Sequence, residues 1–144
     1  MAAELTQTYT VENLNEVANW LFDIGKKHTV WLFEGELGAG KTTLIREVAR
    51  LMEVKEEVSS PSFGLVNQYE DAGGNPIYHL DLYRLKSLEE AIEIGLTEMV
   101  DSGYFCLIEW ASAIDFQPVV PFVRIQISHI DLTSRLLSVT LHEN

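Results

Sequence analysis

The stretch WLFEGELGAGKTTLI, Trp31 to Ile45, decides the fold of this chain. It opens with a short apolar run typical of a buried strand and then becomes rich in glycine. Gly35, Gly40, Lys41 and Thr42 satisfy the pattern Gly-x-x-x-x-Gly-Lys-Thr. In such a loop, backbone N–H groups converge on phosphate oxygens at the start of a helix. The stretch therefore predicts a strand, a phosphate-binding loop and a helix, in that order.

The loop residues have distinct predicted roles in holding a nucleotide. We expect the ammonium of Lys41 to reach the β- and γ-phosphates and the hydroxyl of Thr42 to hold Mg²⁺. The loop residues predicted to contact the nucleotide are Gly35, Leu37, Gly38, Ala39, Gly40, Lys41, Thr42 and Thr43.

The segments around the loop predict one α/β domain over residues 1–144, with a P-loop NTPase-like mixed sheet flanked by helices. Apolar residues at helical spacing predict helices over 11–27, 42–52 and 87–100. Apolar or alternating runs predict strands over 29–33, 63–71, 76–85, 104–110, 122–130 and 135–143. The turn DAGGN makes the second and third of these strands a predicted β-hairpin, and the last two form a predicted antiparallel pair.

Composition excludes several classes of protein. Ten basic and 22 acidic residues give a net charge of −12, which disfavours direct binding to nucleic acid and favours a basic protein partner. The chain has no apolar stretch long enough to cross a membrane and no secretory signal, so a cytoplasmic location is expected. Its single cysteine, Cys106, lies in an apolar run and is predicted to be a buried, inert thiol.

Two carboxylates are candidates for a metal site. Glu109 follows the apolar run FCLI, where a strand would end, and Asp81 lies in YHLDLYRL, another apolar strand. A phosphate-bound Mg²⁺ needs a carboxylate at such a position. The alternative for Asp81 is a salt bridge to an arginine. Strand alternation places His79 on the same face as Asp81, and we interpret this histidine as structural rather than as a metal ligand.

The segment SSPSF, Ser59 to Phe63, carries three hydroxyl groups around one proline. Pro61 biases Ser60 towards an extended backbone and removes one N–H donor. From composition alone the segment is either an ordinary turn before a strand or a switch that senses the γ-phosphate. The residues of the predicted switch are Ser60, Pro61, Ser62 and Phe63.

Four motifs together, GELGAGKTT, SSPSFGLV, YHLDLYRL and LIEW, resemble the bacterial TsaE family in order and spacing. The resemblance runs from about Val30 to Trp110. It implies a P-loop ATPase that uses ATP and Mg²⁺ in the synthesis of tRNA threonylcarbamoyladenosine. It also implies two partners, TsaB and TsaD. TsaD transfers the threonylcarbamoyl group to adenosine in tRNA and the ATPase resets the complex, so this chain would meet tRNA only through its partners.

The resemblance also implies roles for individual residues. Lys41 and Thr42 would hold phosphates and Mg²⁺, and Asp81 and Glu109 would belong to the metal and water site. Trp110 would lie beside the nucleotide. Residues 60–63 would be the switch, although Ser62 replaces the threonine that is usual in the family. The family threonine near the adenine is also absent, because Leu14 and Asn15 stand in that region.

Other functions for a small P-loop protein are a small-molecule kinase, a GTPase and a nucleotide-sensing module that does not hydrolyse. A kinase needs several arginines to clamp two phosphorylated substrates, and this chain has five in all. A GTPase needs an Asn-Lys-x-Asp segment, which the sequence lacks. The two carboxylates favour hydrolysis over mere sensing. Because no arginine or glutamine is identifiable as the catalytic finger, we expect hydrolysis by the isolated chain to be slow.

Overall fold

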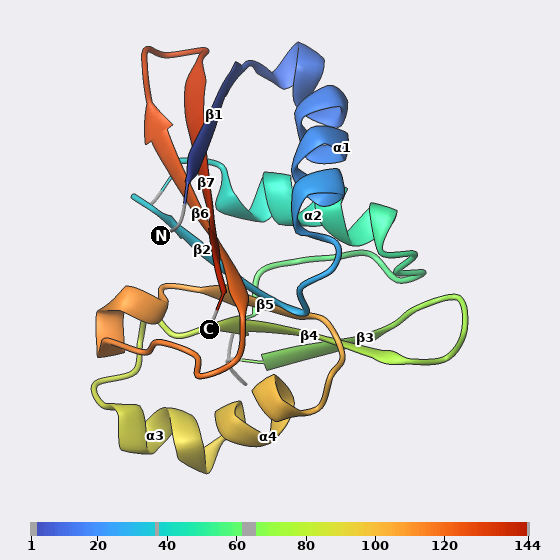
Figure 1. Cartoon of the computed structure of the whole chain (residues 1–144), viewed down its shortest axis with the longest axis vertical. Coiled ribbons are helices and arrows are strands. Elements are labelled where there is room, and N and C mark those ends of the chain that lie inside the picture. The colour runs from blue at the N-terminus through green and yellow to red at the C-terminus, as the bar shows by residue number, and fades with distance from the viewer. Residues whose placement is uncertain (1–2, 37, 62–65, 144) are drawn as a thin grey trace.

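Strand β2 (Val30–Gly35) lies at the centre of a mixed sheet of seven strands in the order β1-β7-β6-β2-β5-β4-β3 (Figure 1). The computed structural model describes residues 3–36, 38–61 and 66–143. Strand β2 pairs in parallel with β5 (Cys106–Glu109) and β6 (Phe122–His129), and β5 pairs in parallel with β4 (Pro76–Asp81). The outer strands β1 (Glu4–Tyr9), β7 (Arg135–His142) and β3 (Val66–Glu70) are antiparallel to their neighbours.

Helices cover both faces of this sheet (Figure 1). Helices α1 (Leu14–Gly25) and α2 (Lys41–Leu51) pack over one apolar cluster. Helices α3 (Leu88–Glu93) and α4 (Leu96–Asp101) cover the other. Alternation along β2 sends its side chains to both clusters, so the strand is buried on each face. Short 3-10 helices, η1 (Val11–Asn13) and η2 (Ala111–Ile114), complete the order of elements.

The fold confirms the predicted P-loop NTPase-like α/β class, and most predicted elements are present. The prediction of one helix over residues 87–100 is wrong, because the chain breaks into α3 and α4. Gly95 stands between them with φ 97°, a left-handed conformation that an α-helix cannot continue through. Ser87 caps α3 as predicted by accepting a hydrogen bond from the Glu90 N–H at 3.3 Å.

Two parts of the sheet differ from the predicted elements. Strand β1 was not predicted. Its residues are exposed except for Tyr9, and all but Leu5 and Tyr9 are polar, so its sequence shows neither a buried run nor a regular alternation. It is held as an edge strand by antiparallel pairing with β7. The first residues of the predicted hairpin strand, 63–65, lie outside the described residues, and β3 runs from Val66 to Glu70.

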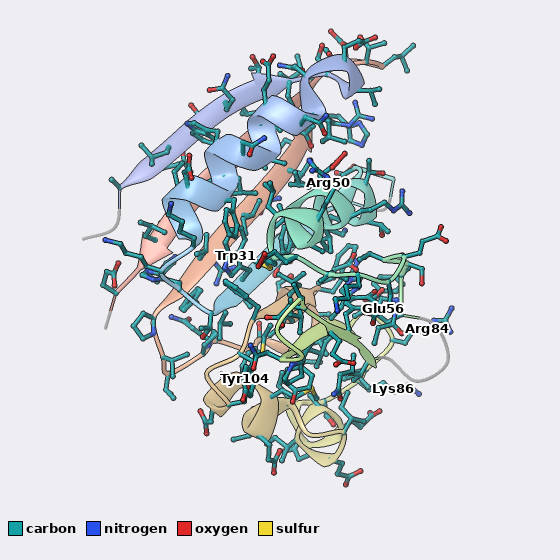
Figure 2. All side chains as sticks on the ribbon, turned by 90° about the vertical axis from the view of Figure 1, so that its right-hand side faces the viewer. Trp31, Arg50, Glu56, Arg84, Lys86 and Tyr104 are labelled. Carbon is teal, nitrogen blue, oxygen red and sulfur yellow. The ribbon has the colours of Figure 1, made fainter. Side chains whose placement is uncertain are left out.

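The interior is large enough to bury whole aromatic rings. Figure 2 shows Trp31 inside the molecule, whereas Arg50, Arg84 and Lys86 project from its outside. The Trp31 indole is fully buried and donates its N–H to the carbonyl of His28 at 2.9 Å. No helix among the residues that the structure describes is long and apolar enough to span a bilayer.

The reactivity of the Cys106 thiol can be used to test the packing of the core. Its side chain is fully buried, and burial raises the pKa of the thiol to about 12. Because the thiolate is the reactive form, we expect Ellman's reagent to leave the native protein unlabelled in mildly alkaline buffer. One thiol per chain should react in guanidinium. Rapid labelling of the native protein would contradict the packing of β5 in the core.

Candidate functional site

The carboxyl ends of β2, β4 and β5 meet at one edge of the sheet. Asp81 is the last residue of β4 and pairs in register with Glu109, the last residue of β5. The phosphate loop follows β2, the strand beside β5, so all three strand ends deliver residues to the same place. A pocket of about 350 Å³ opens there, lined by Glu36, Gly38, Gly40, Lys41, Thr42, Thr43, Ser60, Asp81, Glu109 and Trp110.

The glycines of the loop are required by its backbone. Gly38 and Gly40 have φ values of 82° and 96°, which residues other than glycine rarely adopt. Gly35 has φ 153°, and a Cβ there would lie 2.9 Å from the carbonyl oxygen of Ile127 on β6. The loop can therefore approach β6 closely at Gly35 and turn sharply into α2 at Gly40. Leu37 lies outside the described residues.

Lys41 is a buried cation at the start of α2. It is 6% exposed, and its ammonium donates to the backbone carbonyls of Gly35 and, at 3.4 Å, Glu36. The ammonium also lies 4.0 Å from the ring centroid of Trp110, a cation–π contact. Burial lowers the pKa of Lys41, and the charges of neighbouring carboxylates, Glu109 first, oppose that shift.

Asp81 is a half-buried carboxylate with its own backbone anchor. Its Oδ1 accepts a hydrogen bond from the Tyr83 N–H at 3.0 Å. Burial raises the pKa of Asp81, the bond from Tyr83 lowers it, and the Glu109 charge raises it further. Among the residues placed by the structure, no arginine forms an ion pair with Asp81, so the salt-bridge alternative has no support here.

Glu109 is buried and is held by a histidine. Its Oε2 lies 2.8 Å from Nε2 of His79, which is fully buried on the neighbouring strand β4. His79 was predicted to be a structural residue. Its contact with Glu109 suggests that its structural role is to hold this predicted metal-site carboxylate.

Thr42 contacts the predicted switch segment. Its Oγ1 lies 2.7 Å from Oγ of Ser60, so the hydroxyl expected to hold Mg²⁺ is hydrogen-bonded to the segment before β3. Ser60 is exposed and Pro61 is buried. Ser62 and Phe63, the other two residues of the predicted switch, lie outside the described residues.

The described residues fit a magnesium ion that is shared with phosphate. They contain no group of three or more His, Cys, Asp and Glu side chains placed to hold a metal by themselves. The pocket is instead lined by oxygen donors, which include the predicted ligands Thr42, Asp81 and Glu109. Mg²⁺ prefers oxygen ligands and is usually bound through one or two carboxylates together with substrate phosphates. The donor set is therefore suited to Mg²⁺ only when a phosphate is also present.

Trp110 sits on a strained backbone beside the pocket. Its φ of 62° is left-handed, which is uncommon for a bulky side chain, and its ring packs 4.9 Å from that of Tyr83. The turn that follows is anchored by Glu34, a buried carboxylate that accepts from the Ser112 N–H at 3.1 Å and from its hydroxyl at 2.7 Å. Sequence reasoning missed Glu34, although a carboxylate at the end of the apolar run WLF was a visible signal.

A second hollow of about 400 Å³ adjoins the other side of the loop. It shares Gly38, Gly40 and Thr43 with the phosphate pocket. Ala39 of the loop also lines it, and the other lining residues come from two distant parts of the chain. They are Tyr9, Thr10, Val11, Glu12 and Leu14 near the start, and Leu132, Thr133 and Arg135 at the β6–β7 turn and the first residue of β7. Of Leu14 and Asn15, which occupy the expected adenine region in the sequence, Leu14 lines this hollow. The pairing of β1 with β7 brings the residues near the start of the chain beside those of the β6–β7 turn.

Comparison with known proteins identifies the family. The family described as "Threonylcarbamoyl adenosine biosynthesis protein TsaE" matches residues 8–137. The chain belongs to the TsaE family. It is 36% identical over 129 residues to "tRNA threonylcarbamoyladenosine biosynthesis protein TsaE" of Rickettsia conorii, which covers 89% of this chain and 73% of that protein. The protein of the same name from Bacillus subtilis is 36% identical over 121 residues, 84% of this chain and 73% of that one.

A solved structure extends the comparison to the fold. The crystal structure of Bacillus subtilis YdiB superposes with a TM-score of 0.77 at 27% identity and covers 100% of this chain and 89% of that chain. The predicted resemblance to the TsaE family is thus confirmed. In this TsaE-family chain the phosphate pocket brings together Gly38, Gly40, Lys41, Thr42, Thr43, Ser60, Asp81, Glu109 and Trp110 of the predicted site residues. Their roles remain predictions.

The close approach at Gly35 can be tested by adding one methyl group. Gly35→Ala should lower the free energy of unfolding by about 1–3 kcal/mol, because the new Cβ would overlap the Ile127 carbonyl. Gly73→Ala is the matched control, since its Cβ would meet side-chain atoms only at 3.4 Å or more. Urea titrations of both variants measure the difference. Equal stability of Gly35→Ala and the unmodified chain would contradict the packing of the loop on β6.

Proposed function

We propose that this TsaE-family chain is a Mg²⁺-dependent ATPase that supports threonylcarbamoyl transfer to adenosine in tRNA. It would act in the cytoplasm with the TsaB–TsaD complex, and the partners would hold the RNA. The observation that carries the proposal is the meeting of Lys41, Thr42, Asp81 and Glu109 in one pocket at the phosphate loop. A phosphate-binding loop, a cation and a set of oxygen ligands are the parts that phosphoryl transfer from ATP requires.

The backbone at the start of α2 and five side chains of the pocket would each have a part in this reaction. The N–H groups at the start of α2 bind phosphate oxygens, and the positive end of the helix dipole adds to their attraction. Lys41 neutralises charge on the β- and γ-phosphates. Thr42, Asp81 and Glu109 would hold Mg²⁺, which would stabilise the negative charge that develops on the transferring phosphoryl group. The Trp110 ring covers the Lys41 ammonium and limits the access of water to it.

The second hollow supports a nucleotide of the size of ATP. Its lining combines apolar side chains, among them Val11 and Leu132, with the hydroxyl groups of Thr10 and Thr133. Val11 and Leu132 are strongly exposed residues, at 77% and 97%, so covering them with an adenine ring would be favourable. The hollow adjoins the phosphate loop directly, as the base and ribose of a bound nucleotide require.

The pocket is short of positive charge for rapid hydrolysis. Lys41 is the only basic side chain among the described residues that line it. The guanidinium groups of Arg46 and Arg135 donate to backbone carbonyls at 3.2 and 3.3 Å. Arg50 and Arg84 project from the outside of the molecule (Figure 2). Arg124, the fifth arginine, lines a neighbouring hollow with Gly35, Glu36 and Trp110 and does not line the phosphate pocket. We therefore expect a cation that acts on the transition state to come from a partner, which also disfavours the kinase alternative.

Lys41→Ala tests the phosphate site. It should reduce ATP turnover by about 100-fold or more, because a charge that acts on the transferring phosphoryl group is lost. Lys27→Ala, which removes an exposed lysine, is the matched control and should leave turnover unchanged. Release of inorganic phosphate under saturating ATP and Mg²⁺ measures both. Turnover by Lys41→Ala within a factor of two of the unmodified chain would show that the loop is assigned wrongly.

Dependence on partners is tested by comparing phosphate release from the isolated chain with release after TsaB and TsaD are added. The isolated chain should be slow and the partners should accelerate it. The net charge of −12 should make the assembly weaken as salt rises. Fast hydrolysis that ignores the partners would favour a kinase-like or independent enzyme. Nucleotide binding without hydrolysis under either condition would favour the nucleotide-sensing module.

A further inference from the structure

A buried chain of hydrogen bonds leads away from Glu109 across three neighbouring strands. Glu109 on β5 contacts Nε2 of His79 on β4 at 2.8 Å. Nδ1 of the same ring lies 3.1 Å from the hydroxyl of Tyr69 on β3. The Tyr69 hydroxyl in turn reaches the backbone of Ser59, with 3.3 Å to its N–H and 3.0 Å to its carbonyl. The hydrogen bonds therefore end at Ser59, directly before the predicted switch residue Ser60 and seven residues before β3 begins at Val66.

The bonds fit one direction of donation. In a neutral imidazole one nitrogen donates and the other accepts. If Nε2 of His79 donates to the Glu109 carboxylate, Nδ1 must accept, and the Tyr69 hydroxyl is the donor that faces it. The Tyr69 oxygen then accepts from the N–H of Ser59, and Asn67 supplies a second donor to it at 3.2 Å. Asn67 also donates to the Ser59 carbonyl at 3.0 Å. Because the single Tyr69 proton then goes to His79, the Ser59 carbonyl accepts from Asn67 rather than from Tyr69.

The same segment is tied to the nucleotide side of the pocket. Ser60, the residue after Ser59, is hydrogen-bonded to Thr42 at 2.7 Å. Glu109 and Thr42 both line the phosphate pocket. Glu109 and Thr42, two of the three predicted magnesium ligands, therefore face the same pocket and are also connected through His79, Tyr69, Ser59 and Ser60.

The Tyr69–His79 pair has little reason to be polar if it serves packing alone. His79 is fully buried and Tyr69 is 6% exposed, and buried polar groups cost free energy unless each finds a partner. Tyr69 belongs to the apolar cluster beneath α1 and α2, where a phenylalanine would fill nearly the same volume. The hydroxyl and the imidazole instead contact each other, and their further partners are Glu109 in the site, Ser59 beside the predicted switch, and Asn67.

We propose that Tyr69 and His79 are positioning residues that couple the orientation of Glu109 to the conformation of the segment at Ser59 and Ser60. A movement of this segment when Thr42 engages nucleotide and Mg²⁺ would pass through Tyr69 and His79 and fix the Glu109 carboxylate for hydrolysis. The inference rests on the proposed ATPase function for its effect on turnover, whereas the coupling itself can be observed without hydrolysis.

Tyr69→Phe is the variant that tests the coupling in turnover. It keeps the buried ring and removes the one hydroxyl that joins His79 to Ser59. We expect kcat for ATP to fall by about tenfold or more, with the KM for ATP changed less than twofold, because groups that orient a metal ligand typically contribute that much to activity. Tyr78→Phe is the matched control: it removes a hydroxyl from the adjacent β4 position on the opposite face of the sheet and should leave kcat unchanged.

Two further variants separate coupling from stability. His79→Gln combined with Tyr69→Phe should lose no more kcat than the larger single effect, since both break the same chain. Asn67→Ala, at the edge of the network, should give a smaller loss of kcat with unchanged thermal stability. This variant still tests the coupling if Tyr69→Phe folds poorly. Additive losses, or a fall in thermal stability with kcat retained, would overturn the coupling and leave a purely structural pair.

The readout that does not depend on turnover is the ¹⁵N NMR signal of the His79 ring, assigned by its absence in His79→Gln. The unmodified chain should show the tautomer protonated at Nε2. Addition of Mg²⁺ with a non-hydrolysable ATP analogue should shift both ring nitrogens, and Ser60→Ala or Tyr69→Phe should reduce that shift by at least half. If the chain binds nucleotide without hydrolysing it, the proposed function fails and these signals alone decide the coupling. His79 signals that respond equally in all variants would overturn it.

Discussion

The buried ammonium group of Lys41 is the constraint on which the arrangement of the site depends. Burial lowers the pKa of this group, and the carboxylates of Glu109, Asp81 and Glu34 favour its charged form. These carboxylates stand at the ends of β5, β4 and β2. A buried charge is tolerated only where opposite charges and hydrogen bonds compensate it. Because the three strands run parallel, their carboxyl ends bring the three carboxylates to the Lys41 ammonium. The charge of Lys41 is therefore compensated only in a sheet with this strand order.

The sequence could predict the parts of this arrangement that are encoded locally. The loop from Gly35 to Thr43 follows from residue types at fixed spacing, and Glu109 follows from a carboxylate at the end of an apolar run. Strand β1 could not be predicted, because its polar residues are held by pairing with β7, more than 120 residues away in the chain. The break at Gly95 was missed for a different reason: apolar periodicity continues across it, and only the left-handed backbone ends the helix.

The contacts of His79 and Tyr69 show a deeper limit of sequence reasoning. Alternation along β4 placed His79 on the face of Asp81, but its partners lie on β5 and β3, on either side. The β3–β4 hairpin was predicted, whereas the parallel pairing of β4 with β5 required knowledge of the strand order. A buried polar side chain in an apolar strand was therefore the available signal, and the sheet order was needed to identify the groups that satisfy it.

The distribution of positive charge gives the proposed need for a partner a physical basis. Arg46 and Arg135 hold the backbone at two places, through the carbonyl of Val58 just before Ser59 and through the carbonyl of Ala39 within the loop. Withdrawing either guanidinium to serve the transition state would leave a backbone acceptor without its donor and loosen the wall of the pocket. Two of the five arginines are thus engaged with backbone carbonyls, and none of the described arginines lines the phosphate pocket. Supplying that cation from a basic partner removes the conflict, and the negative charge of this chain would draw such a partner towards it.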